Sequence, residues 1–157
     1  MLKHFNLAGR NAIVTGSTRG IGLAIADQLA EAGARVVISS RSQADCDIAA
    51  AGINAAHGEG RAFARAASLS DKTSLERLVE NTRLTLGPID ILICNAASNP
   101  HFGPMATISD EQFRTVIEEN ILANHWLVQM SVPDMIERKQ GVILLISSIG
   151  AYTGSIM

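Results

Sequence analysis

Short apolar runs alternate with longer amphipathic stretches along the chain, and no other feature restricts its fold as much. The short runs have the composition of buried strands, and the longer stretches repeat apolar residues with helical spacing. The expected strands are residues 11–16, 34–41, 61–68, 89–96 and 141–150. The expected helices are residues 20–33, 43–60, 70–87 and 109–135. This order predicts an α/β fold, a doubly wound, Rossmann-like parallel sheet of about five strands with right-handed crossovers.

The helical patterns also predict which side chains face the sheet. In residues 70–87 the inward-facing side chains are Leu75, Leu78, Val79 and Leu86. In residues 20–33 the apolar residues that share one face are Ile21, Ile25 and Leu29. The last helix begins at Ser109, a favourable N-cap residue, and Pro133 is expected to kink its final turns.

Composition limits the classes of protein to which the chain can belong. With 157 residues, 47% of them hydrophobic and 18% charged, the chain is expected to form one globular domain, residues 1–157. A formal net charge of -2 disfavours a nucleic-acid-binding surface. No apolar run approaches the roughly 20 residues of a membrane span, and the N-terminal stretch lacks a signal core, so a cytoplasmic protein is expected. The cysteines and histidines show no metal-ligand spacing, so no metal is expected.

The stretch TGSTRGIG, residues 15–22, joins the first expected strand to the first expected helix. Its glycines, Gly16, Gly20 and Gly22, permit a tight turn, and the helix N-terminus offers free N–H groups to a phosphate. Folds of this type hold a dinucleotide at this position. The spacing differs from G-x-G-x-x-G, so an ordinary glycine turn is the alternative. A P-loop is excluded because no Gly-Lys-Ser/Thr follows.

Two arginines indicate which dinucleotide is bound. Arg19 lies within the glycine loop, and Arg41 follows a strand that ends in Ser39 and Ser40 without a carboxylate. NAD sites usually carry an acidic residue at that strand end, whereas guanidinium groups pair with a 2′-phosphate. The sequence therefore predicts NADP(H) in preference to NAD(H); the alternative is that both arginines are solvated surface residues. A methyltransferase shares the fold class but does not need a basic residue in this loop.

Four ordered motifs resemble those of the short-chain dehydrogenase/reductase family. TGSTRGIG matches its TGxxxGxG loop, and NAA at residues 95–97 resembles its N-A-G motif, with alanine in place of glycine. NILAN, from residue 120, and ISSIG, residues 146–150, resemble the segments that carry the family's catalytic asparagine and serine. The resemblance covers nearly the whole chain, and VVISSR with CNAASNPHFGPM further resembles the NADPH-dependent carbonyl reductases of the family.

The resemblance implies a set of cofactor-binding residues. Those that would cradle the phosphates are Gly16, Ser17, Thr18, Arg19, Gly20, Ile21 and Gly22. Those that would meet the 2′-phosphate are Ser40 and Arg41, and those that would line the inner ribose are Asn95, Ala96 and Ala97. Ser68 and Leu69 follow the third strand, where the family often has an aspartate near the adenine, so backbone contacts are expected there.

Asn120 and Ser148 are the catalytic residues that the resemblance implies. The family's asparagine holds a water in a proton relay and bends its helix, and the serine polarises the substrate carbonyl. Asn120 also shares a helical face with Phe113 and Ile117, a stripe expected to be buried, where an amide must find hydrogen-bond partners. A structurally satisfied asparagine is the alternative.

The rest of the family's proton relay, Tyr-x-x-x-Lys, does not occur in this sequence. The sole tyrosine is Tyr152, and the residue four positions later is Ile156, so Tyr152 is not the family's catalytic acid. By resemblance the strand order begins 3-2-1-4-5 and continues with further strands, which makes residues 141–150 an apolar edge strand here. The chain is interpreted as a C-terminally incomplete domain, either a fragment or a prematurely ended reading frame.

Two functions are compatible with these observations. The first is an NADP(H)-dependent oxidoreductase that acts on a small carbonyl or alcohol; this chain would be its N-terminal part, inactive alone, and the full-length form a homo-oligomer. The second is a catalytically silent protein that binds NADP(H). The loop at residues 98–109 belongs to the region that sets specificity in the family, but it does not identify the substrate.

Overall fold

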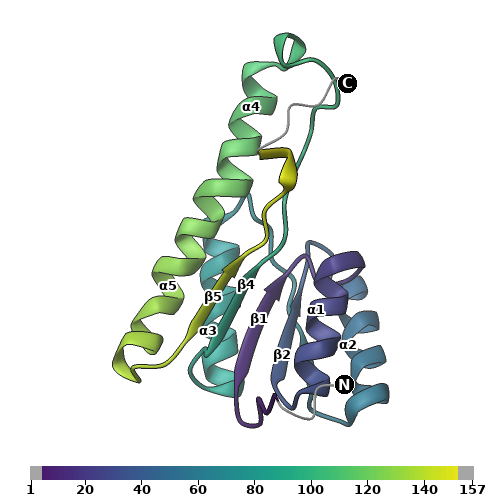
Figure 1. Cartoon of the computed structure of the whole chain (residues 1–157), viewed down its shortest axis with the longest axis vertical. Helices are drawn as coiled ribbons and strands as arrows, with labels where there is room; N and C mark the ends of the chain where they lie inside the picture. Colours follow the sequence, from purple (N-terminus) through teal and green to yellow (C-terminus); the bar gives the residue numbers. More distant parts are fainter. Residues whose placement is uncertain (1–4, 152–157) are drawn as a thin grey trace.

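The computed structural model describes residues 5–151, which form a five-stranded sheet with helices on both faces (Figure 1). The strands are β1 (Asn11–Thr15), β2 (Arg35–Ser39), β3 (Ala62–Ala64), β4 (Ile91–Cys94) and β5 (Val142–Leu145). All pairings are parallel, and the strand order is β3-β2-β1-β4-β5. The predicted doubly wound parallel sheet is confirmed, including the order of its strands.

Helices connect the strands and extend beyond them. The first three are α1 (Gly20–Glu31), α2 (Gln43–His57) and α3 (Lys72–Leu86). One long helical segment follows, made of α4 (Asp110–Ile117), the π-helix η2 (Glu118–Leu122) and α5 (Ala123–Glu137). The 3-10 turns are η1 (Met105–Thr107) and η3 (Ile149–Ala151). Within residues 5–151, no helix combines the length and apolar character that a membrane crossing needs.

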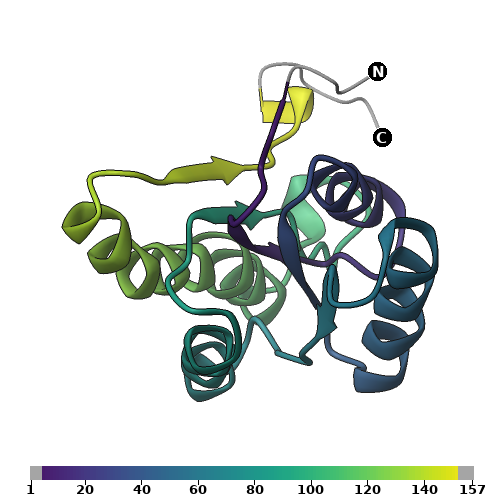
Figure 2. The same cartoon turned by 90° about the horizontal axis from the view of Figure 1, so that it is seen from below.

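A separate hydrophobic core lies on each face of the sheet. Helices α1 and α2 cover one face, and α3 and α5 cover the other (Figure 2). Side chains of β1 alternate between them: Ala12 and Val14 pack with α1 and α2, and Ile13 packs with α3 and α5. Every residue of β1 and β4 is buried, as expected for parallel strands covered on both faces.

The inward face of α3 is as predicted, and that of α1 differs from the prediction at Ile21. The buried residues of α3 include Leu75, Leu78, Val79 and Leu86. In α1 the buried residues are Gly22, Ala26 and Ala30, and Ile21 is 66% exposed. Ile25 and Leu29 are partly buried and pack against the core, so Ile21 alone departs from the prediction.

The long helical segment is distorted at η2, and α5 continues without a break through Pro133. The prediction that Phe113 and Ile117 are buried is wrong, because these side chains are 46% and 44% exposed. The reason is visible in Figure 1: α4 extends past the carboxyl ends of the strands, beyond the sheet that would cover it.

Asp90 joins three segments at the amino ends of neighbouring strands. Its buried carboxylate accepts hydrogen bonds from Arg10 Nη1 at 3.2 Å and from the backbone N–H of Asn11 at 2.9 Å, and it forms an ion pair with Arg138 Nη2 at 2.8 Å. Arg10 precedes β1, Asp90 itself precedes β4, and Arg138 precedes β5. The charge of the buried carboxylate is therefore compensated by two cations, as burial of a charge requires.

Asp134 ties α5 to α3 and to the start of β4. Its carboxylate accepts two hydrogen bonds from Arg83 Nε, at 2.9 and 3.1 Å, and one from the Ile89 N–H at 3.1 Å. Burial raises the pKa of Asp134. The Arg83 and Ile89 hydrogen bonds, with the charges of Arg83 and Arg138, lower it by more, so the pKa lies below its ordinary value of 3.8.

We expect Asp134→Asn to lower the free energy of unfolding at neutral pH by about 1–3 kcal/mol, because charge-assisted hydrogen bonds are weakened. The carboxyl pKa is lower in the folded than in the unfolded protein. Its contribution is therefore complete above about pH 4 and is lost as the pH falls through the folded-state pKa. Urea unfolding should show the difference between wild type and variant shrinking at about pH 3.

Glu76→Gln is the matched control for this measurement. Glu76 faces Lys72 at 3.9 Å in an exposed i,i+4 pair, so its substitution should change stability by well under about 1 kcal/mol at either pH. An effect of Asp134→Asn that is equal at both pH values would contradict the assignment.

Candidate functional site

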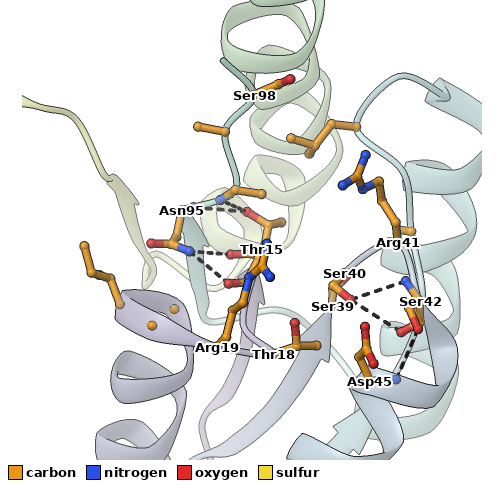
Figure 3. Close-up of a pocket in the computed structure, with 18 of the residues that line it drawn as sticks. Thr15, Thr18, Arg19, Ser39, Ser40, Arg41, Ser42, Asp45, Asn95 and Ser98 are labelled. Carbon is orange, nitrogen blue, oxygen red and sulfur yellow. Dashed lines mark hydrogen bonds between the residues drawn. The ribbon is translucent and has the colours of Figure 1, made fainter. Parts of the chain in front are cut away.

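A cavity of about 870 Å³ lies at the carboxyl ends of the strands, between the segments that follow β1, β2, β3 and β4 (Figure 3). The chain reverses its winding direction between β1 and β4, the point at which open α/β sheets bind ligands. All predicted cofactor-binding residues except Ser17 and Ser68 line the cavity. They are Gly16, Thr18, Arg19, Gly20, Ile21, Gly22, Ser40, Arg41, Leu69, Asn95, Ala96 and Ala97.

The glycine loop depends on left-handed backbone angles and on a close approach of α1. Gly16 has φ 63° and Gly20 has φ 57°, a region that residues with a Cβ rarely adopt. A Cβ on Gly22 would meet the Gly16 carbonyl oxygen and lie 2.5 Å from Asn95 Nδ2. The N-cap residue, Arg19, makes no side-chain cap, so the first N–H groups of α1 are available to an anion.

Ser17 holds the loop to β2 and does not line the cavity. Its buried hydroxyl donates to Val14 O at 2.6 Å and accepts from Ser39 N at 2.9 Å. Its backbone N–H donates to Ser39 O at 3.1 Å. Because the Ser17 hydroxyl donates its proton to Val14 O, it does not offer this proton to a phosphate in this structure.

Thr15 and Asn95 join the ends of β1 and β4. Thr15 Oγ1 accepts hydrogen bonds from Asn95 N at 3.0 Å and Ala96 N at 3.1 Å. Asn95 Nδ2 in turn donates to Thr15 O at 3.0 Å and Gly16 O at 3.2 Å. Asn95 therefore supports the glycine loop directly, in addition to lining the cavity.

The turn after β2 carries the second predicted arginine. Ser42 caps α2 by accepting from Asp45 N at 3.2 Å, and Cys46 Sγ accepts from Ser40 N at 3.2 Å. Arg41, between them, is exposed. Among the ion pairs of residues 5–151, none involves Arg41 or Arg19. Two guanidinium groups without an acidic partner therefore border the same cavity.

Asn120 acts on the cavity through Ser98. Its Oδ1 accepts from Ser98 N at 2.7 Å, and its Nδ2 donates to Ser98 O at 2.8 Å. Ser98 lines the cavity, whereas Asn120 lies behind it within η2, so the expected distortion of the helix is present. The Asn120 carbonyl oxygen accepts from Asn124 Nδ2 at 2.7 Å, a contact for which the sequence offered no role.

Ser148 and Ser68 do not line the cavity. Ser148 is exposed in the segment after β5, where its Oγ accepts from Gly150 N at 3.1 Å. Ser68 N donates to Ser74 Oγ at 3.2 Å, and the hydroxyl of Ser68 lies 2.9 Å from Ser70 Oγ. Tyr152 lies outside the described residues.

The remaining reactive groups do not form a second centre within the described residues. Cys94 is buried at the end of β4, and burial raises the pKa of its thiol to about 11, so it is protonated at neutral pH. No group of three or more His, Cys, Asp or Glu side chains could hold a metal ion in residues 5–151.

Six polar residues that line the cavity were not among the predicted site residues: Thr15, Ser39, Ser42, Asp45, Ser98 and Glu119. Thr15 and Ser98 adjoin predicted motifs, so their position next to those motifs was the available signal. Asp45 and Glu119 also line the cavity. They carry negative charge toward it from helices, and no motif marks them.

The sequence and the fold agree on the family. Residues 10–157 match the family described as short chain dehydrogenase. The chain belongs to the short-chain dehydrogenase family. It is 41% identical over 147 residues to dehydrogenase/reductase SDR family member 4 of Oryctolagus cuniculus, with 93% of this chain and 55% of that protein aligned. The Homo sapiens protein of the same name is 38% identical over 156 residues, covering 99% and 55%.

Solved structures of the family have the same fold. L-sorbose reductase from Gluconobacter frateurii, complexed with NADPH and L-sorbose, superposes with a TM-score of 0.88 at 31% identity, covering 94% of this chain and 55% of that one. A metagenomic short-chain oxidoreductase in complex with NADP gives 0.87 at 33% identity, covering 95% and 66%. The chain thus spans about 55% of the length of the curated relatives above.

We expect Gly22→Ala to destabilise this short-chain dehydrogenase domain by about 1–3 kcal/mol, because the added Cβ overlaps backbone that cannot move freely. Gly52→Ala is the matched control: Gly52 lies within α2 with nothing within 4 Å of an added Cβ. Alanine there should stabilise the protein by about 0.5–1 kcal/mol, because it favours the helix. Thermal unfolding of both variants tests the pair, and equal effects of the two substitutions would refute the close approach at Gly22.

Proposed function

We propose that this chain is the NADP(H)-binding part of an oxidoreductase that transfers a hydride between the nicotinamide and a carbonyl or alcohol substrate. The observation that carries the proposal is the pair of arginines, Arg19 and Arg41, that borders a glycine-lined cavity without acidic partners among the described residues. The relatives solved with NADPH and L-sorbose, and with NADP, support the same cofactor and a carbonyl substrate.

The residues of the cavity suit a dinucleotide phosphate. The Gly16–Gly20 turn and the uncapped N-terminus of α1 would hold the pyrophosphate. This turn packs so closely against α1 that a Cβ on Gly22 would overlap it. Arg19, Ser40 and Arg41 would hold the 2′-phosphate, because a guanidinium group can donate two parallel hydrogen bonds to phosphate oxygens. When bound, the cofactor supplies the hydride. Asn95 and its two following alanines would border the inner ribose.

The protein's contribution to chemistry is the handling of the substrate oxygen and its proton. We propose that the Ser148 hydroxyl donates a hydrogen bond to the substrate carbonyl, and that Asn120 supports the proton relay from η2, where it also fixes Ser98. The proton donor of the family belongs to Tyr-x-x-x-Lys, which the 157-residue sequence does not contain. For the chain alone we therefore expect cofactor binding without turnover, and for the whole protein a homo-oligomeric enzyme.

A catalytically silent protein that binds NADP(H) is the second candidate. It differs from the first candidate in whether the native protein carries Tyr-x-x-x-Lys. Both candidates share the cofactor site, so cofactor binding does not separate them. The native reading frame downstream of Met157 does, because only the enzyme needs a tyrosine and a lysine there.

We expect NADPH to bind the chain more tightly than NADH in calorimetric titrations. Arg41→Ala and Arg19→Ala should each weaken NADPH binding by about tenfold or more and leave NADH nearly unchanged, because each loses a charge-assisted contact with the 2′-phosphate. Arg77→Ala removes an exposed arginine of α3 away from the cavity and serves as the matched control. Equal losses for both cofactors, or tighter binding of NADH to the wild type, would contradict the assignment.

We expect an extended chain that includes a downstream Tyr-x-x-x-Lys to oxidise NADPH in the presence of a carbonyl substrate such as a ketose. The 157-residue chain should bind NADPH without this reaction. In the extended protein, Ser148→Ala should lower kcat by about 100-fold or more, because the developing charge on the oxygen loses a donor. If the native frame lacks the motif, or if Ser148→Ala leaves kcat intact, the enzymatic proposal fails.

A further inference from the structure

An acidic side chain shares the arginine end of the cavity. Asp45, in the first turn of α2, lines the cavity together with Ser40, Arg41 and Ser42. Figure 3 shows its side chain directed toward the cavity, between Thr18 and the turn that follows β2. Its backbone N–H donates to Ser42 Oγ at 3.2 Å, so the helix cap fixes the point from which the carboxylate extends.

The Asp45 carboxylate has no hydrogen-bond or ion-pair partner among residues 5–151. Acidic residues in the first turn of a helix are often explained by their favourable interaction with the helix dipole. That role requires a position near the helix N-terminus and does not require the side chain to line a cavity. Asp47, two residues later, carries the same charge on α2 but does not line this cavity, and it accepts from Gln43 Nε2 at 2.8 Å.

A carboxylate at this end of the cavity affects the two dinucleotides in opposite directions. A phosphate monoester carries a charge of about -1.5 to -2 at pH 7, so Asp45 repels the 2′-phosphate that Arg19 and Arg41 attract. The 2′-hydroxyl of NAD(H) is a hydrogen-bond donor, for which a carboxylate is the usual acceptor in this fold. The cavity thus combines the cations of an NADP(H) site with the anion of an NAD(H) site, the latter supplied by α2 and not by the end of β2.

We propose that Asp45 is a specificity-determining residue that narrows the preference for NADP(H) over NAD(H). This inference rests on the proposed dinucleotide-binding function and adds the side chain that limits its selectivity. Because the group is exposed, its effect on the 2′-phosphate is moderate and is screened by salt.

The test is a calorimetric titration of the 157-residue chain and its Asp45→Asn variant with NADPH and with NADH. Asparagine has nearly the same size as aspartate and keeps the backbone N–H that donates to Ser42 Oγ, so the variant should fold as the wild type does. We expect the Kd of NADPH to fall by about three- to tenfold, because one repulsive charge is removed. The Kd of NADH should stay constant or rise, and raising the salt to about 0.5 M should reduce the gain for NADPH.

Asp47→Asn is the matched control, with the same change of net charge on the same helix. It should leave the ratio of the two dissociation constants unchanged. If Asp45→Asn and Asp47→Asn shift the ratio equally, or if neither shifts it while the wild type binds NADPH, the inference is overturned and the proposed function stands. If the wild type binds neither dinucleotide, the proposed function fails and the inference fails with it.

Discussion

The contact between the start of α1 and the end of β1 is the constraint on which the cavity depends. Gly22 lies against the Gly16 carbonyl and the Asn95 amide, with no room for a Cβ. The same amide donates to Thr15 O and Gly16 O, so the ends of β1 and β4 are held to the loop by one side chain. These contacts therefore fix the glycine loop, α1 and the end of β4 relative to one another. They also fix the position of the unpaired N–H groups at the start of α1.

The other side of the cavity is built differently. After β2, the backbone is held by a serine cap and by the Cys46 thiol, which accepts from Ser40 N. Neither contact restrains the Arg41 side chain, which is exposed, as is Asp45. A ligand thus meets a rigid backbone surface at one end and adjustable charged side chains at the other. Selectivity between related dinucleotides is expected to reside at the adjustable end, since single side chains there act without disturbing the loop.

The strands and the glycine turn could be predicted because they depend on local patterns that only a few arrangements satisfy, and the resemblance to the family implied the strand order. The exposure of Ile21 could not, since apolar spacing does not reveal that this residue of the first turn of α1 borders the cavity and not the core. The burial of Phe113 and Ile117 depends on what covers them, which periodicity does not encode. The place of Asp45 could not be predicted because the pattern of dinucleotide sites marks the strand end, whereas the helix that follows also borders the cavity.

The Asp90 junction has a consequence for how the sheet responds to change. One buried carboxylate serves two arginines that are remote in the sequence, and each arginine precedes a different strand. With either cation removed, the carboxylate keeps the other, so the free-energy effects of losing Arg10 and Arg138 are coupled and not additive. When one of these cations is lost, the carboxylate that joins the amino ends of β1, β4 and β5 therefore still has a cationic partner.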